Sequence, residues 1–282
     1  MKYYTTTTEF NCGIDLHSKQ MYVCIMDREG AVRVHQNIRG NDFGHFLKLA
    51  GPYRHDLTVV CECTFNWYWL ADACFAAGIK FVLAHALYLA HIHGGKNKND
   101  RIDSEKLAHL LRTNLIPPAY VYPAERRPMR ALLRQRMSYV WRRAEVLAHV
   151  STKQSAEGLV PAAKCGRNRD VWEERILDQY ANPLHRFGAE CDVEIVRAYD
   201  RQIRKLDQET ERLAKTHEGR DYQLLLTVPG VGRVLALTIL FEMDTVRRFP
   251  TAKDFLSYSR LVKGSVASAG KVKGLTGGKM GN

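Results

Sequence analysis

Residues 96–112 read Lys96-Asn-Lys-Asn-Asp100-Arg-Ile-Asp103-Ser-Glu-Lys-Leu-Ala-His-Leu-Leu-Arg112, the pattern of a loop that runs into an amphipathic helix. Asn99 or Asp100 can cap this helix by accepting hydrogen bonds from its free N–H groups. Asp100 and Asp103 are three residues apart, so a helix places them on one face. Two carboxylates at one helix start repel each other unless a cation or the helix dipole offsets their charge. The pattern therefore indicates either a site for a hard divalent ion such as Mg²⁺ or a capped, solvent-exposed helix start.

The residues before this helix predict an α/β domain with a mixed five-stranded sheet. Three strands that can form a meander precede an alternation of helix and strand, which is typical of such a sheet. Asp15 lies on the first predicted strand and Glu62 near the end of the fourth, each within an apolar run. If these two strands pair at the sheet centre, both carboxylates converge with Asp100 and Asp103. Strands are predicted at 11–16, 21–26, 31–38, 57–63 and 80–84, and helices at 41–50, 66–77 and 86–92.

A second region, 126–218, is predicted to be helical and to follow a proline-rich linker. Apolar residues recur with the alternating spacing of four and three within 129–154 and again within 192–216, which indicates coiled-coil packing. The simplest arrangement is an antiparallel hairpin of two helices, formed within one chain or between two chains. The spacing fits homo-oligomerisation through this region, and it equally fits an ordinary amphipathic helical bundle. Four arginines of the first helix are candidates for nucleic-acid binding: Arg130, Arg134, Arg142 and Arg143.

The last region, 219–282, resembles a helix-hairpin-helix element followed by a basic tail. The turn around Gly230 and Gly232 precedes a helix, and its N–H groups can bind a phosphate. The same residues also fit a turn that leads into a buried helix and binds no phosphate. The tail is rich in glycine, serine and lysine, so it is predicted to be a loop on a phosphate backbone, through Lys271 and Lys273, or a disordered end.

The overall charge narrows the class of partner. The chain of 282 residues has a net charge of +12 and a pI near 9.4, which favours nucleic acid as the partner before a membrane. The positive charge gathers in 126–182 and 220–282, whereas 1–125 is nearly neutral. No stretch predicts a signal peptide or a membrane span. Seven scattered cysteines, an odd number with no CxxC pair, fit a cytoplasmic protein.

The acidic set D…E…D-x-x-D on this order of elements resembles the catalytic core of the RNase H/RuvC-like superfamily. The short sequence segments around these carboxylates and in the C-terminal region resemble the insertion sequence 110 family of transposases, and the resemblance extends over nearly the whole chain. The segments that carry this resemblance are Gly13-Ile-Asp15-Leu-His17, Glu62-Cys-Thr64, Lys98-Asn-Asp100-Arg-Ile-Asp103, Val228-Pro-Gly-Val-Gly232 and Ser268-Ala-Gly270-Lys271…Lys279-Met-Gly-Asn282.

The resemblance implies a domain at 1–125 that binds Mg²⁺ through Asp15, Glu62, Asp100 and Asp103, and activates oxygens for phosphoryl transfer. It also implies a transposase domain at 219–282 whose serine attacks a DNA phosphate, with a structured RNA encoded by the element as guide. Ser268 stands where the family has this serine, Ser265 is the alternative, and both also fit ordinary loop serines. Lys271 could neutralise the attacking oxygen. Family members continue past this tail with a further helix, so the C-terminal domain is expected to be truncated.

The interpretation favoured by these patterns is a transposase, an RNA-guided site-specific DNA recombinase of a bacterial insertion sequence. One alternative is a RuvC-like nuclease that uses Mg²⁺ and water and needs no serine. The other is an inactive remnant that binds nucleic acid without cutting it. His17 is expected on the opposite strand face from Asp15 or just past the strand, as a structural or substrate-contacting residue.

Overall fold

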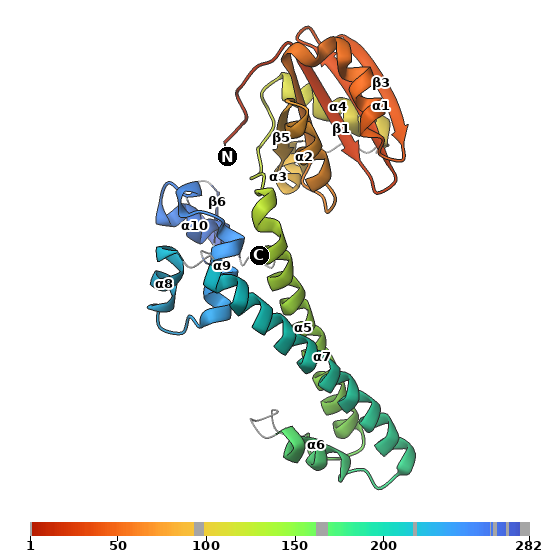
Figure 1. The fold of residues 1–282 in the computed structure, drawn as a ribbon, viewed down its shortest axis with the longest axis vertical. Coiled ribbons are helices and arrows are strands. Elements are labelled where there is room, and N and C mark those ends of the chain that lie inside the picture. Colours follow the sequence, from red (N-terminus) through yellow and green to blue (C-terminus); the bar gives the residue numbers. More distant parts are fainter. Residues whose placement is uncertain are drawn as a thin grey trace. The chain divides into compact units, whose positions relative to one another are not determined.

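The computed structural model describes residues 2–92, 99–161, 169–216, 219–259, 261, 264–268 and 271–276 (Figure 1). The chain divides into two compact units, Met1–Glu125 and Arg126–Asn282. Within the described ranges, no helix combines the length and the apolarity that crossing a bilayer requires.

The first unit contains a five-stranded sheet in the order β3-β2-β1-β4-β5. Strand β1 lies at the centre, antiparallel to β2 and parallel to β4. Strands β2 and β3 are antiparallel, and β4 and β5 are parallel. The strands are β1 (Phe10–Leu16), β2 (Gln20–Asp27), β3 (Val32–Arg39), β4 (Leu57–Glu62) and β5 (Lys80–Ala84). The predicted mixed sheet is confirmed, and so is the pairing of its first and fourth strands at the centre.

Helices cover both faces of this sheet (Figure 1). On one face, Ile14 and Cys61 pack with Phe46 of α1 and Leu70 of α2. On the other face, Val60 and Val82 pack with three leucines of α4 (Leu107, Leu110 and Leu111). The helices are α1 (Phe43–Ala50), the short 3₁₀ helix η1 (Gly51–Asp56), α2 (Tyr68–Ala76), α3 (Ala86–Ile92) and α4 (Asp100–Arg112).

Helix α4 lies directly on β1 because β1 has a glycine at the crossing point. A Cβ atom added at Gly13 would lie 2.1 Å from the carbonyl oxygen of Ser104 and 2.4 Å from the amide nitrogen of Ala108. Ser104 and Ala108 are fully buried, and both are small. The absence of a side chain at Gly13 therefore sets how closely the acidic start of α4 approaches the sheet.

The second unit is built on two long antiparallel helices, α5 (Arg127–Ala156) and α7 (Pro183–Thr216). Three ion pairs cross between them: Arg136–Asp207 at 2.6 Å, Arg143–Asp200 at 2.8 Å and Lys153–Asp192 at 2.9 Å. As the residue number rises along α5, the partner's number falls along α7, so the predicted hairpin forms within one chain. Helix α7 begins nine residues before the predicted start at 192. Asn182 accepts the N–H of Leu184 there, and proline suits a first helical position.

The 3₁₀ turn η2 (Ala124–Arg126) precedes α5, and the short helix α6 (Arg169–Leu177) lies between α5 and α7 in the chain. The elements after α7 are α8 (Arg220–Leu226), α9 (Arg233–Met243), η3 (Val246–Arg248), α10 (Ala252–Tyr258), β6 (Gly264–Ser268) and β7 (Lys271–Thr276). Strands β6 and β7 form an antiparallel hairpin. The prediction of a loop or a disordered end was therefore wrong for these residues. Their β-branched residues, among them Val266 and Val272, favour strands despite the glycines around them.

Candidate metal centre

Asp15 and Glu62 lie on neighbouring parallel strands where these strands end. Ile14 pairs with Cys61 in the β1–β4 register, so Asp15 and Glu62 each come one residue later. Ile14 and Cys61 both point into the core beneath α1 and α2. Because successive side chains of a strand alternate between faces, Asp15 and Glu62 belong to the opposite face, which α4 covers.

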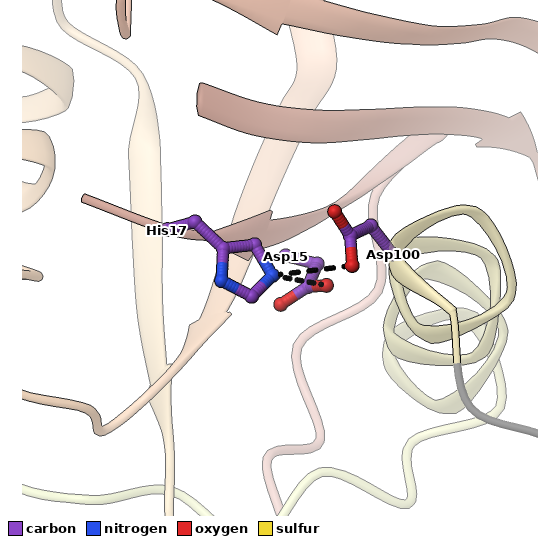
Figure 2. A group of neighbouring side chains, drawn as sticks. All are labelled: Asp15, His17 and Asp100. Atoms are coloured by element: carbon purple, nitrogen blue, oxygen red, sulfur yellow. Dashed lines mark hydrogen bonds and ion pairs between the residues drawn. The ribbon is translucent and has the colours of Figure 1, made fainter. Parts of the chain in front are cut away.

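Asp100 joins Asp15 from the first turn of α4. This helix begins where the prediction placed it: the side chain of Asn99 accepts the N–H of Ile102 at 2.8 Å. Nε2 of His17 lies 3.2 Å from a carboxylate oxygen of Asp15 and 3.3 Å from one of Asp100 (Figure 2). Possible ligand atoms of these three residues all lie within 4.8 Å of one another.

His17 comes directly after the last residue of β1, which is one of the two positions expected for it. Its ring points towards Asp15 and Asp100 (Figure 2). Sequence reasoning did not place it there. The spacing of two residues from Asp15 was the available signal, because residues two apart in an extended chain point to the same side. The expectation that His17 lies on the opposite face was therefore wrong.

A polar chain from β2 and β3 holds the other side of Asp100, and the sequence analysis missed it. Nε2 of Gln20 donates to Asp100 at 2.9 Å, and Nδ2 of Asn37 donates to Oε1 of Gln20 at 3.1 Å. Gln20 is the first residue of β2, and Asn37 lies opposite Tyr22 on β3. The pair therefore fixes the carboxylate of Asp100 to the sheet.

The two other predicted carboxylates lie at the margin of this group. Asp103 is one turn along α4 and accepts a hydrogen bond from Lys106 at 3.3 Å. Glu62 is half-buried at the end of β4. Neither belongs to the tight group of Asp15, His17 and Asp100. The structure thus brings together two of the four predicted carboxylates and a histidine.

The electrostatics of the group favour a cation. Burial raises the pKa of Asp15, and the nearby charges of Asp100 and Asp103 raise it further, while His17 acts in the opposite direction. A positive ion next to Asp15 would stabilise the charged form of its carboxylate. The oxygen-rich donor set suits a hard divalent ion, with the imidazole as an additional nitrogen donor. The residues present therefore fit a divalent metal.

The predicted nucleic-acid residues of α5 occupy different environments. Arg130 and Arg134 both donate to Glu242 of α9, at distances from 2.5 to 2.9 Å. Burial alone would raise the pKa of Glu242, but the two arginines outweigh it and lower that pKa. Arg143 pairs with Asp200, whereas Arg142 is exposed.

In the C-terminal region, Gly230 has a φ of +84° in the turn between α8 and α9, and Gly232 is the residue that precedes α9. Lys271 is exposed at the start of β7. The backbones of Ser265 and Ser268 belong to β6. The side chains of both serines and of Lys273 lie outside the described residues.

Comparison with known proteins covers most of the chain. Residues 12–152, half of the chain, match a family model of the DEDD domain of IS110 elements that is described as a transposase. Residues 222–282 match a second model, described as the transposase IS116/IS110/IS902 family. No curated protein matches the sequence. The two models follow one another in the order that the resemblance implied, and the chain belongs to the IS110 family of transposases.

Proposed function

We propose that this transposase cuts and rejoins DNA with Mg²⁺ held by Asp15, Glu62, Asp100 and Asp103 and with Ser268 as nucleophile. The observation that supports the proposal best is the meeting of Asp15 and Asp100 from distant parts of the chain. Both carboxylates lie within 3.3 Å of Nε2 of His17, a positively charged N–H donor whenever that ring is protonated. The two carboxylates therefore converge on one point, as the ligands of a cation do.

The residues of the site divide the work between binding and orientation. Asp15 and Asp100 offer carboxylate oxygens, and Gln20 keeps Asp100 turned towards Asp15. Glu62 and Asp103 would complete the ligand set from the next strand and the next turn of the helix. When bound, divalent ions supply positive charge that stabilises the attacking and leaving oxygens of a phosphoryl transfer.

The proposed nucleophile rests on the backbone of the hairpin and on the family match. Ser268 pairs with Lys271 across β6 and β7. A lysine next to the serine would stabilise the negative charge of the attacking oxygen. Attack of the serine oxygen on a DNA phosphate would form a phosphoserine link and release a deoxyribose hydroxyl. Ser265 stays the alternative, at the second position of the same strand.

A guide RNA and a homo-oligomer complete the proposal. The basic side chains that would contact the nucleic acids include the exposed Arg142 and Lys271, and Lys273. The backbone N–H groups of the turn at Gly230 and Gly232 would add a phosphate contact. Arg130, Arg134 and Arg143 would contribute only where an acidic partner leaves some of their N–H groups available.

The test mixes the purified protein with Mg²⁺, the RNA encoded beside its gene and the DNA ends of its element. Denaturing gels then detect protein joined covalently to DNA. We expect an adduct with the natural protein and none with Ser268→Ala or Asp15→Asn; Ser257→Ala, in α10, is the control that retains it. An adduct that survives in Ser268→Ala but not in Ser265→Ala would reassign the nucleophile.

The same experiment separates the other two interpretations. A nuclease that uses water would cut DNA in both serine variants and form no adduct. A binding remnant would retain RNA without cutting at all.

A further inference from the structure

We propose that Phe65 is a stacking site for an unpaired nucleobase beside the carboxylate site, which is the proposed ligand set of Asp15, Glu62, Asp100 and Asp103. The inference rests on the proposed function, because the base would belong to the strand whose phosphate meets the carboxylates. It concerns how that strand is positioned and not the chemistry of the cut.

Phe65 is the most exposed of the large apolar side chains in the described residues, with 82% of its surface accessible. Its neighbour Trp67 is 6% exposed and belongs to the core. A phenyl ring gains free energy by leaving water, so contact of this ring with a flat apolar partner would be favourable.

The loop that carries Phe65 is fixed to the sheet on one side and to the core on the other. The N–H of Cys63 donates to the carbonyl oxygen of Ala84 at 2.9 Å, which continues the β4–β5 pairing by one residue. The hydroxyl of Thr64 donates to the side chain of Asn66 at 3.0 Å, and Trp67 anchors the far end. The ring of Phe65 is therefore presented at low entropic cost, which a stacking contact requires.

The distance from Phe65 to Glu62, one of the proposed ligands, suits a nucleic-acid strand. Phe65 follows Glu62 by three residues, so their Cα atoms are separated by at most about 10 Å. Successive bases of a DNA strand are about 3.4 Å apart along the axis, so a base within about three nucleotides of the bound phosphate can reach the ring. The segment from Cys63 to Trp67 carries no charged residue that would repel the backbone.

A nucleobase is the occupant that this arrangement favours. Every base has a flat π face, so a single aromatic ring binds it without reading its sequence. Tyr88 of α3 is also partly exposed, but its ring already stacks on His85, with the centroids 4.4 Å apart. Phe65 has no ring contact of this kind among the described residues.

The test measures the affinity of the full chain for a short, fluorescently labelled single-stranded DNA and for the same strand without bases. Ca²⁺ replaces Mg²⁺ so that the strand stays intact. We expect Phe65→Ala to lower the affinity for the strand with bases about 5- to 150-fold. Its affinity for the abasic strand should not change, and Phe65→Tyr should retain the preference for bases.

Phe75→Ala is the matched control. Phe75 is also exposed, at 52%, but it lies near the end of α2 and contacts Phe81 near the start of β5, away from the carboxyl ends of the strands. Because the ring of Phe65 is so exposed, its removal should leave the melting temperature unchanged. Equal affinities of Phe65→Ala and the natural protein for the strand with bases would overturn the proposal, as would an equal loss for both strands. If Asp15→Asn cuts DNA normally, the proposed function fails, whatever Phe65 does.

Discussion

Replacing Gly13 by alanine should separate the acidic start of α4 from the sheet without altering any carboxylate. The new Cβ atom would lie 2.1 Å from the carbonyl oxygen of Ser104, 2.4 Å from the amide nitrogen of Ala108 and 2.8 Å from Cβ of Leu107. Two of these contacts are to backbone, which cannot rotate away. Ordinary contact begins at 3.4 Å, so α4 must move by about 1.3 Å.

Overpacking of this kind costs about 1–3 kcal/mol of folding free energy. For a unit of this size, the melting temperature should fall by roughly 3–15 °C. The same movement would stretch the contacts of Asp100 with His17 and Gln20, now 3.3 and 2.9 Å, beyond hydrogen-bonding distance. We therefore expect Mg²⁺ affinity to fall together with stability.

Scanning calorimetry with and without Mg²⁺ measures both effects on the full chain. Gly51→Ala is the control, because an added Cβ there has no heavy atom within 4 Å and the residue has helical dihedral angles, with φ at −45°. It should melt like the natural protein. A Gly13→Ala protein that melts normally and gains the natural stabilisation from Mg²⁺ would refute the reasoning that close packing at this glycine builds the site.

Three other substitutions test separate features. Glu242→Gln removes two half-buried ion pairs and should lower the melting temperature by roughly 4–8 °C for a loss of about 2 kcal/mol, whereas Glu209→Gln, at an exposed pair, should change it little. Because the pKa of Glu242 is lowered, its stabilisation is present above the ordinary value of 4.5 and lost as the pH falls through the lowered pKa, so the two proteins should converge in acid melts. Asp15→Asn removes a charge from a crowded acidic group, so calorimetry should show no loss of stability without divalent ions and no gain when Mg²⁺ is added. Gln20→Ala leaves the carboxylate of Asp100 without its hydrogen-bond donor and should weaken Mg²⁺ binding about 10- to 100-fold in titration calorimetry; an unchanged affinity would show that Gln20 does not orient the site.

The sheet and its neighbours could be predicted from the sequence because each segment carries a clear pattern. The fifth strand and the helix at 86–92 have the predicted bounds, and the other predicted strands and helices of the first unit differ by one or two residues, whereas the 3₁₀ helix η1 was not predicted. The acidic residues stood out because Asp15 and Glu62 interrupt apolar strands, which the hydrophobic pattern alone does not explain.

The finer parts of the site could not be predicted because they depend on contacts between distant segments. Gln20 reaches Asp100 across 80 residues, and nothing in its own neighbourhood distinguishes it from an ordinary strand start. The ring of His17 could have turned to either side of the strand end. Likewise, the basic pattern of α5 does not reveal that Glu242 takes up both Arg130 and Arg134.

The segments that build the carboxylate site all lie within the first unit, between Asp15 and Asp103 in the chain. Domains usually fold as units during synthesis, the N-terminal one first. We therefore expect this site to exist on the ribosome roughly 10–30 s before the residues from 126 onward have been made. During that interval a nascent transposase would already bind divalent ions, yet it would still lack the serine with which we propose that it joins DNA. If Ser268 is the nucleophile, the order of the two halves along the chain would keep an incomplete polypeptide from forming a covalent link to the genome.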